Sequence, residues 1–226
     1  MNMNMFEQFA SPEFLSIPTF TLSMLIPIML INNKPNLIGN RMMAATMWLF
    51  KKIIINMTNQ LSTTGQKWSN LLTSLLIIIL LSNTLGLLPY TYTTTSQLSM
   101  NMAIALPLWL ATVVTGMMKK PTTTLAHMLP EGSPTPLVPF LIMIETISLL
   151  MRPIALGVRL TANITAGHLL MTMISSATLS LISLYTPISI MTTTILFLLM
   201  LLEMAVACIQ AYVFVLLLIL YLQENT

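Results

Sequence analysis

The C-terminal half of the sequence contains an apolar stretch of unusual length. From Leu137 to Leu222, hydrophobic residues are interrupted by only a few ionisable side chains. Over the whole chain 56% of residues are hydrophobic and 7% are charged, whereas about 25% are charged in soluble domains. Since about 20 apolar residues of helix cross a bilayer core, the sequence predicts an all-α integral membrane protein.

Apolar windows of this length divide the chain into four regions. The first span is expected at 14–31, although two prolines weaken it as a helix. Spans at 71–88 and 98–118 are joined by the short polar segment "PYTYTTTSQ", so they are expected to form a transmembrane hairpin. The fourth region is the stretch 137–222. The N-terminus lacks the basic start of a targeting peptide, so we expect the first span to be retained.

The segment 35–66 mixes cations with Met, Leu, Ile and Trp. This composition is typical of an amphipathic helix at the membrane interface with its cations toward the headgroups, and a plain basic loop is the alternative. The positive-inside rule puts the basic side in the cytoplasm or the mitochondrial matrix, with Glu7, Glu13 and the N-terminus opposite and the C-terminus on the basic side. The cations that define it are Lys34, Arg41, Lys51, Lys52, Lys67, Lys119 and Lys120.

The fourth region is too long for upright spans. A helix from Met191 to Leu222 would run about 48 Å, against a hydrocarbon core of about 30 Å. We expect two long tilted helices, 137–184 and 189–222, that form a hairpin around Pro187. Two short upright spans on each side are the alternative. Pro153 removes a helical hydrogen bond and can kink the first helix.

Charged groups inside this region are costly, at roughly 2.5 to 3.5 kcal/mol each at a helix centre, so they are functional candidates. Glu145, Arg152 and Arg159 repeat every seven residues and share one helix face, which Asn163 extends by four. Two partners remain open for Arg152, namely Glu145 and lipid headgroups.

The second long helix carries a polar stripe of its own. Glu203 and Gln210 are again seven residues apart and can face the first stripe. His168 follows Arg159 by nine residues, which at about 100° per residue puts it on the opposite side of its helix.

Small residues surround Arg159. Ala155, Ala162 and Ala166 stand at −4, +3 and +7 from it, so a flat strip can admit a helix of another protein. Ordinary packing within the chain is the alternative.

The chemistry of these groups favours proton transfer. A guanidinium stays protonated, so Arg159 can hold or repel a carboxylate but cannot pass on protons, whereas Glu and His can titrate. Glu145 and Glu224 would lie near the basic side and His168 and Glu203 deeper, which gives two half-paths separated by Arg159. A proton-coupled secondary transporter is the alternative function.

Other classes of protein are disfavoured. Two histidines, His127 and His168, and the single Cys208 are too few for a metal or haem site, so we expect no metal and no cofactor. There is no phosphate-binding Gly-rich loop and no basic stripe, so neither nucleotide nor nucleic acid is an expected ligand.

Several blocks of the sequence resemble subunit a of the F-type ATP synthase in its vertebrate mitochondrial form. They include "MRPIALGVRLTANITAGHLL", "LLEMAVACIQAYVF", "NTLGLLPYTYTTTSQLSMN" and "YLQENT", and the resemblance covers the whole chain. It implies a multi-pass subunit of the mitochondrial inner membrane that catalyses no reaction by itself. Its implied partners are the rotating c-ring, the other membrane and peripheral-stalk subunits, and the lipid bilayer.

The resemblance also implies roles for the polar residues. Arg159 would oppose the c-ring carboxylates and block a direct proton leak. His168 and Glu203 would belong to the half-channel from the intermembrane space, and Glu145 and Glu224 to the matrix half-channel. The polar residues near the arginine would be Asn163 and Gln210. Some relatives carry Asp where Glu224 stands, and Arg152 matches no essential group of the family.

Overall fold

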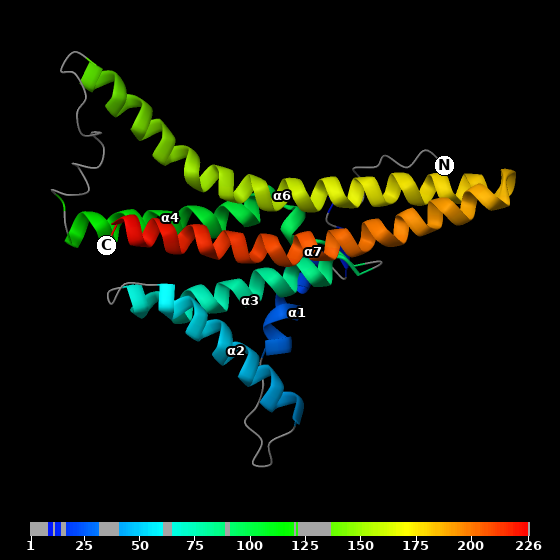
Figure 1. Ribbon diagram of the computed structural model, residues 1–226, viewed down its shortest axis with the longest axis horizontal. Coiled ribbons are helices and arrows are strands. Elements are labelled where there is room, and N and C mark those ends of the chain that lie inside the picture. Colours follow the sequence, from blue (N-terminus) through cyan, green and yellow to red (C-terminus); the bar gives the residue numbers. More distant parts are fainter. Residues whose placement is uncertain are drawn as a thin grey trace. The chain divides into compact units, whose positions relative to one another are not determined.

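The computed structural model describes residues 9–10, 12–14, 17–31, 41–60, 65–88, 91–119, 121 and 137–225. Glu7, Lys34, Lys120 and His127 lie outside these ranges. The described elements, drawn in Figure 1, are β1 (Glu13–Phe14), β2 (Ile17–Pro18), α1 (Thr19–Ile31), α2 (Arg41–Gln60), η2 (Gly65–Trp68), α3 (Ser69–Gly86), η3 (Thr94–Ser96), α4 (Leu98–Lys119), α6 (Val138–Leu184) and α7 (Thr186–Asn225).

The regular elements of the described residues are helices, apart from one short antiparallel pairing of β1 with β2. Within the described ranges, four helical segments are long and apolar enough to cross a membrane, and α1 is shorter. They are Gly65–Gly86, Leu98–Lys119, Val138–Ser183 and Pro187–Glu224. The prediction of an all-α membrane protein is therefore confirmed.

The chain forms two compact units, and the long helices α6 and α7 contribute to both. The first unit comprises Met1–Ile31, Ile78–Met100 and Arg159–Tyr212, and the second comprises Asn32–Ile77, Asn101–Val158 and Val213–Thr226.

The first apolar segment differs from its predicted bounds of 14–31. Helix α1 begins at Thr19 and has 13 residues, which corresponds to about 20 Å. The residues before it are extended, since Phe14 pairs with Ile17 and Glu13 with Pro18. Proline has no N–H to donate, so a helix is not favoured to continue through Pro18. The N–H of Thr19 instead donates to the carbonyl of Pro12 at 3.1 Å.

The basic segment between the first two apolar regions is helical over α2. Trp48 is 64% exposed and Met47 66%, and the Lys52 Nζ lies 5.0 Å from the centroid of the Trp48 ring. Exposed apolar and cationic side chains on one helix favour the amphipathic helix over a plain basic loop. Its location at the membrane interface stays a prediction.

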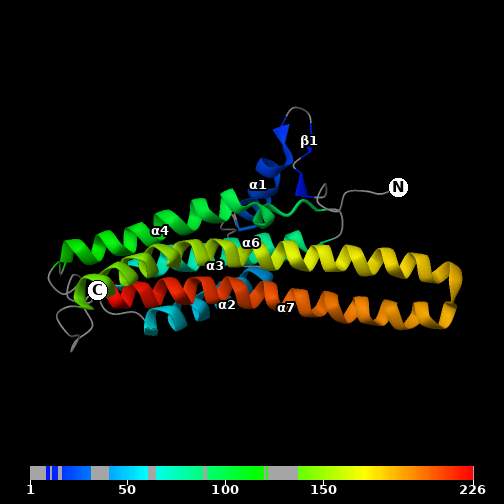
Figure 2. The ribbon, with the colours of Figure 1, turned by 90° about the horizontal axis from the view of Figure 1, so that it is seen from above.

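A single residue joins the two longest helices. Helix α6 has 47 residues and α7 has 40, and Tyr185 alone separates them. The Tyr185 N–H donates to the carbonyl of Leu181 at 2.9 Å, and its carbonyl accepts from the Ser189 N–H at 3.2 Å. Pro187 falls in the first turn of α7, where its missing N–H costs nothing. Figures 1 and 2 show the C-terminal part of α6 beside the N-terminal part of α7.

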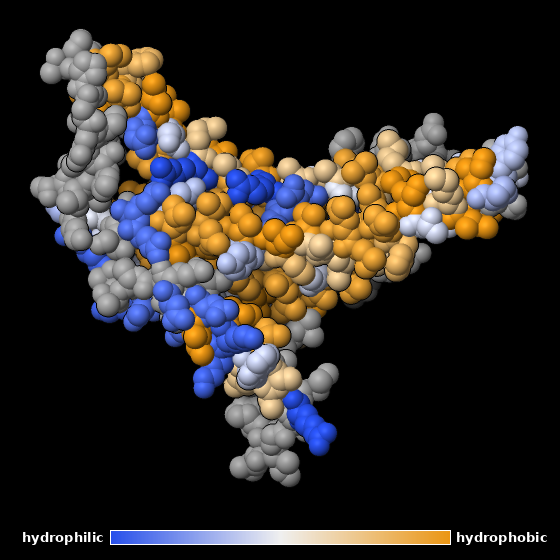
Figure 3. All heavy atoms as spheres, viewed as in Figure 1, coloured by the Kyte–Doolittle hydropathy of each residue, from blue (hydrophilic) through white to orange (hydrophobic). Residues whose placement is uncertain are grey.

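The hairpin of the first unit buries a seam of aliphatic residues on α6 and small residues on α7. On α6, Leu160 and Ile164 are 2% and 3% exposed, and on α7 the side chains of Ala207 and Ala211 are 1% and 0% exposed. Such small residues let two helices approach closely. Many of the outward side chains are large and apolar, and hydrophobic residues dominate the face of this hairpin drawn in Figure 3. This surface fits lipid or another apolar protein better than water.

Hydroxyl side chains on these helices bond to their own backbone. Their hydroxyl groups donate to carbonyls three or four residues earlier, which makes them tolerable in an apolar medium. Examples are Thr165, Thr172, Ser175, Thr178, Ser180, Thr192 and Thr194.

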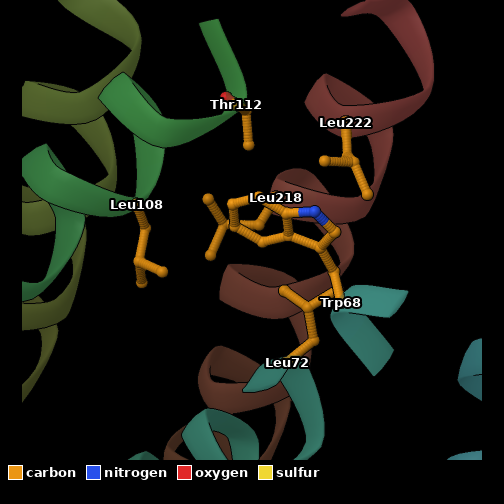
Figure 4. Close-up of a pocket in the computed structure, with 6 residues that line it drawn as sticks. All are labelled: Trp68, Leu72, Leu108, Thr112, Leu218 and Leu222. Atoms are coloured by element: carbon orange, nitrogen blue, oxygen red, sulfur yellow. The ribbon is translucent and has the colours of Figure 1, made fainter. Parts of the chain in front are cut away.

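The core of the second unit joins α3, α4 and α7. Leucines of these helices surround the Trp68 indole, which comes from η2 (Figure 4). An aromatic side chain of this size contributes much apolar area to a core. The residues drawn are Trp68, Leu72, Leu108, Thr112, Leu218 and Leu222.

Candidate functional site

Arg159 is exposed and is the first residue of the segment of α6 that belongs to the first unit. Among the residues that the structure describes, no carboxylate lies within 4.0 Å of its guanidinium, as the ion pairs found there all involve Arg152. Ala162 and Ala166, which flank it on α6, are exposed as well, and so is Ala155 in the second unit. A charged group in an apolar helix therefore stands on an accessible strip of small residues.

Gln210 connects the two helices behind this strip. It is 4% exposed, and its Oε1 accepts from Asn163 Nδ2 at 2.9 Å. Its Nε2 donates to the backbone carbonyl of Arg159 at 2.6 Å. The polar stripe on α7 thus faces α6 at this point, and Gln210 fixes the backbone that carries the arginine.

Glu203 reaches the backbone of α6 at Gly167. Its carboxylate packs so closely that a Cβ built on Gly167 would overlap Oε1 and lie 2.8 Å from Cδ. Glu203 is 6% exposed, and neither carboxylate oxygen has a hydrogen-bond partner among the described residues. The adjacent His168 has its Nε2 buried and also unpartnered there. The structure thus brings Glu203 to the residue that precedes His168.

The second unit contains a separate charged cluster. Arg152 Nη1 lies 2.6 Å from Glu224 Oε2, and Arg152 Nη2 lies 3.8 Å from Glu145 Oε1. The guanidinium carbon is 5.1 Å from the centroid of the Tyr221 ring. Of the two partners left open by the sequence, Glu145 is therefore in contact with Arg152, but the shorter contact is to Glu224.

Two contributors were missed by the sequence analysis. Gly167 has no side chain that could take part in the chemistry. A glycine within a helix costs about 1 kcal/mol relative to alanine, so its occurrence in an apolar helix indicates that another group packs closely against the backbone. Tyr221 stands three residues before Glu224, on the same face of α7, and this spacing could have indicated it. No group of three or more metal-ligating side chains occurs in the described ranges.

Replacing Gln210 with leucine is expected to lower stability. The substitution removes two hydrogen bonds across the seam, and the expected loss is about 1–3 kcal/mol. Thermal unfolding of the purified protein in detergent measures it. The matched control is Gln66→Leu, because Gln66 is exposed and its loss should leave the midpoint unchanged. Equal shifts for the two variants would mean that Gln210 is no structural bridge.

The fold and the charged residues define a helical membrane protein with polar groups inside its apolar segments. Comparison with known proteins makes the class specific, because the profile of the ATP synthase A chain family matches residues 14–223. The chain belongs to this family. It is 72% identical over 226 residues to the ATP synthase F(0) complex subunit a of Lycodon semicarinatus, 57% to that of Struthio camelus and 53% to that of Scyliorhinus canicula. In each case the alignment covers 100% of both chains.

Proposed function

We propose that the chain is the proton-translocating stator subunit of a mitochondrial ATP synthase. Protons enter one half-channel, bind a carboxylate of the c-ring, and leave through a second, offset half-channel after the ring has turned. One proton that crosses the membrane potential releases about 2.3 kcal/mol per 100 mV, so several protons must be summed by rotation for each ATP. The subunit itself catalyses no reaction. Family membership and full-length identity to F(0) subunits a support this proposal.

The observation that carries the proposal is the exposed guanidinium of Arg159. A charge in an apolar helix is costly, and neither Glu145 nor Glu203 offsets it within 4.0 Å. The carboxylate that it needs is supplied by the c-ring. Because the guanidinium keeps its charge, it attracts each arriving carboxylate and prevents protons from passing directly between the half-channels.

The other polar residues supply the two paths. Glu203 and His168 form the path from the intermembrane space. Their buried oxygens and nitrogen have no partner among the described residues, and such groups need a proton or water to be stable in an apolar interior. Glu145 and Glu224 form the path to the matrix, and Asn163 and Gln210 support the arginine.

The proposed setting is the mitochondrial inner membrane. The N-terminus would face the intermembrane space and the C-terminus the matrix, as the positive-inside rule predicts. The strip Ala155, Ala162 and Ala166 would contact the c-ring. The remaining apolar surface would meet lipid and the other membrane and peripheral-stalk subunits.

Disulfide cross-linking tests the proposed contact with the ring. Two variants are made in a Cys208→Ser background, since Cys208 is exposed and would react. Ala162→Cys, on the exposed strip, is expected to cross-link to a cysteine placed beside the c-ring carboxylate, because Cα atoms within about 7 Å can be bridged. Ala207→Cys is the matched control, as Ala207 is 1% exposed inside the seam. Cross-linking at Ala207 alone, or at neither position, contradicts the proposed interface.

A further inference from the structure

The charged cluster of the second unit contains one cation and two carboxylates. Separate nitrogens of the Arg152 guanidinium face Glu224 at 2.6 Å and Glu145 at 3.8 Å. Arginine is suited to this arrangement because its planar fork offers several donors in fixed directions, whereas lysine is a single point charge. The guanidinium carbon also lies 5.1 Å from the centroid of the Tyr221 ring, a cation–π contact. The cluster therefore holds two carboxylates from different helices at one cation.

This cluster is accessible, which argues against a purely structural role. The side chains of Arg152, Glu145 and Glu224 are 27%, 38% and 47% exposed. Ion pairs of this exposure contribute little to stability. Placing a cation in an apolar helix is more costly than this gain. The presence of an arginine at this position is therefore better explained by its holding the two carboxylates in place than by a gain in the stability of the fold.

We propose that Arg152 is a positioning residue of the inner proton path. It holds Glu145 on α6 and Glu224 at the end of α7 close enough to exchange a proton, directly or through one water. The inference rests on the proposed function, which assigns these two carboxylates to the matrix half-channel.

The arrangement allows a proton relay in which nothing is consumed. A proton bound to an oxygen of Glu145 leaves that oxygen and binds Glu224, and Glu224 then releases it to water. The guanidinium keeps its own protons throughout and bonds to whichever carboxylate is ionised.

The test uses the assembled ATP synthase in liposomes, with proton-driven ATP synthesis and passive proton conduction as readouts. Arg152→Gln keeps a planar donor but removes the charge. It is expected to slow both ATP synthesis and proton conduction by at least about twofold, because this is the rate factor that corresponds to the weakest couplings between contacting residues. Arg152→Lys restores the charge without the fork and is expected to recover part of the rate. Arg41→Gln, the same change at an exposed arginine of α2, is expected to leave both rates unchanged.

A double variant separates positioning from folding. If Arg152 acts through Glu224, then Arg152→Gln combined with Glu224→Gln is expected to be no slower than Glu224→Gln alone, with equal amounts of assembled subunit. Additive losses, or loss of the subunit from the complex that accounts for the lower rate, would overturn the inference. Normal conduction in Arg152→Gln would do the same.

The single carboxylate variants distinguish this inference from the proposed function. If Glu145→Gln and Glu224→Gln slow conduction while Arg152→Gln does not, only the role of Arg152 is wrong. If neither carboxylate variant slows conduction, the assignment of the matrix half-channel is wrong, and the role of Arg152 falls with it.

Discussion

Replacing Arg159 with alanine is expected to abolish proton-driven ATP synthesis. The exposed guanidinium is the only fixed cation that the proposed function places at the c-ring, so its loss removes both the attraction for the ring carboxylate and the barrier to a leak. Liposomes that contain the assembled complex should lose synthesis to background. ATP hydrolysis by the detached catalytic head should be unaffected, because the change lies in the membrane.

Two further variants sharpen this result. Arg159→Lys keeps a charge but loses the planar fork, so it is expected to retain a small part of the activity at most. Arg41→Ala removes an exposed arginine of α2 and should leave synthesis intact. Coupled synthesis in the Arg159→Ala complex would refute the proposed function. Solute uptake that depends on Arg159 would favour a proton-coupled transporter instead.

Replacing Gly167 with alanine is expected to remove most of the proton flux. The added methyl group would occupy space now held by the Glu203 carboxylate, which has to move away from α6. On its helix propensity alone the substitution should stabilise α6 by about 1 kcal/mol, so a loss of flux would report the displaced carboxylate. Passive proton conduction in liposomes should fall toward the rate of Glu203→Gln.

The chain offers a matched control and a rescue for this variant. Gly157→Ala makes the same change on the same helix, but its Cβ meets the sulfur of Met102, which lies near the end of a flexible side chain and can shift. Flux through Gly157→Ala should therefore be preserved. Glu203→Asp shortens the acid by one methylene and should restore part of the flux in the Gly167→Ala background. Normal flux in Gly167→Ala alone would show that the position of Glu203 does not limit conduction.

Periodicity within one helix was the part of the site that the sequence could predict. Seven-residue spacing placed Glu145 and Arg152 on one face of α6, and the structure shows an ion pair between them. The same spacing placed Glu203 and Gln210 on one face of α7, and Gln210 accepts a hydrogen bond from Asn163 on α6. Pro187 predicted the break between the long helices, because proline is favoured only in the first turn of a helix.

Contacts between distant residues were beyond that reasoning. Glu224 follows Arg152 by 72 residues, and no local pattern relates the two positions. The sequence therefore offered only Glu145 and lipid as partners. Gly167 was missed for a similar reason, since the need for a missing Cβ arises only when Glu203 approaches from α7. The late start of α1 reflects a β pairing before it that apolar composition does not report.

The one-residue connection at Tyr185 has a consequence for how this chain can vary in length. Each residue of an α-helix turns the following side chains by about 100°, so deleting one residue from 186–202 would rotate Glu203 and Gln210 out of phase with α6. No loop longer than Tyr185 separates the two helices, so the connection cannot compensate for this rotation. Natural length differences among related chains should therefore be absent from this hairpin and confined to segments that end before α6.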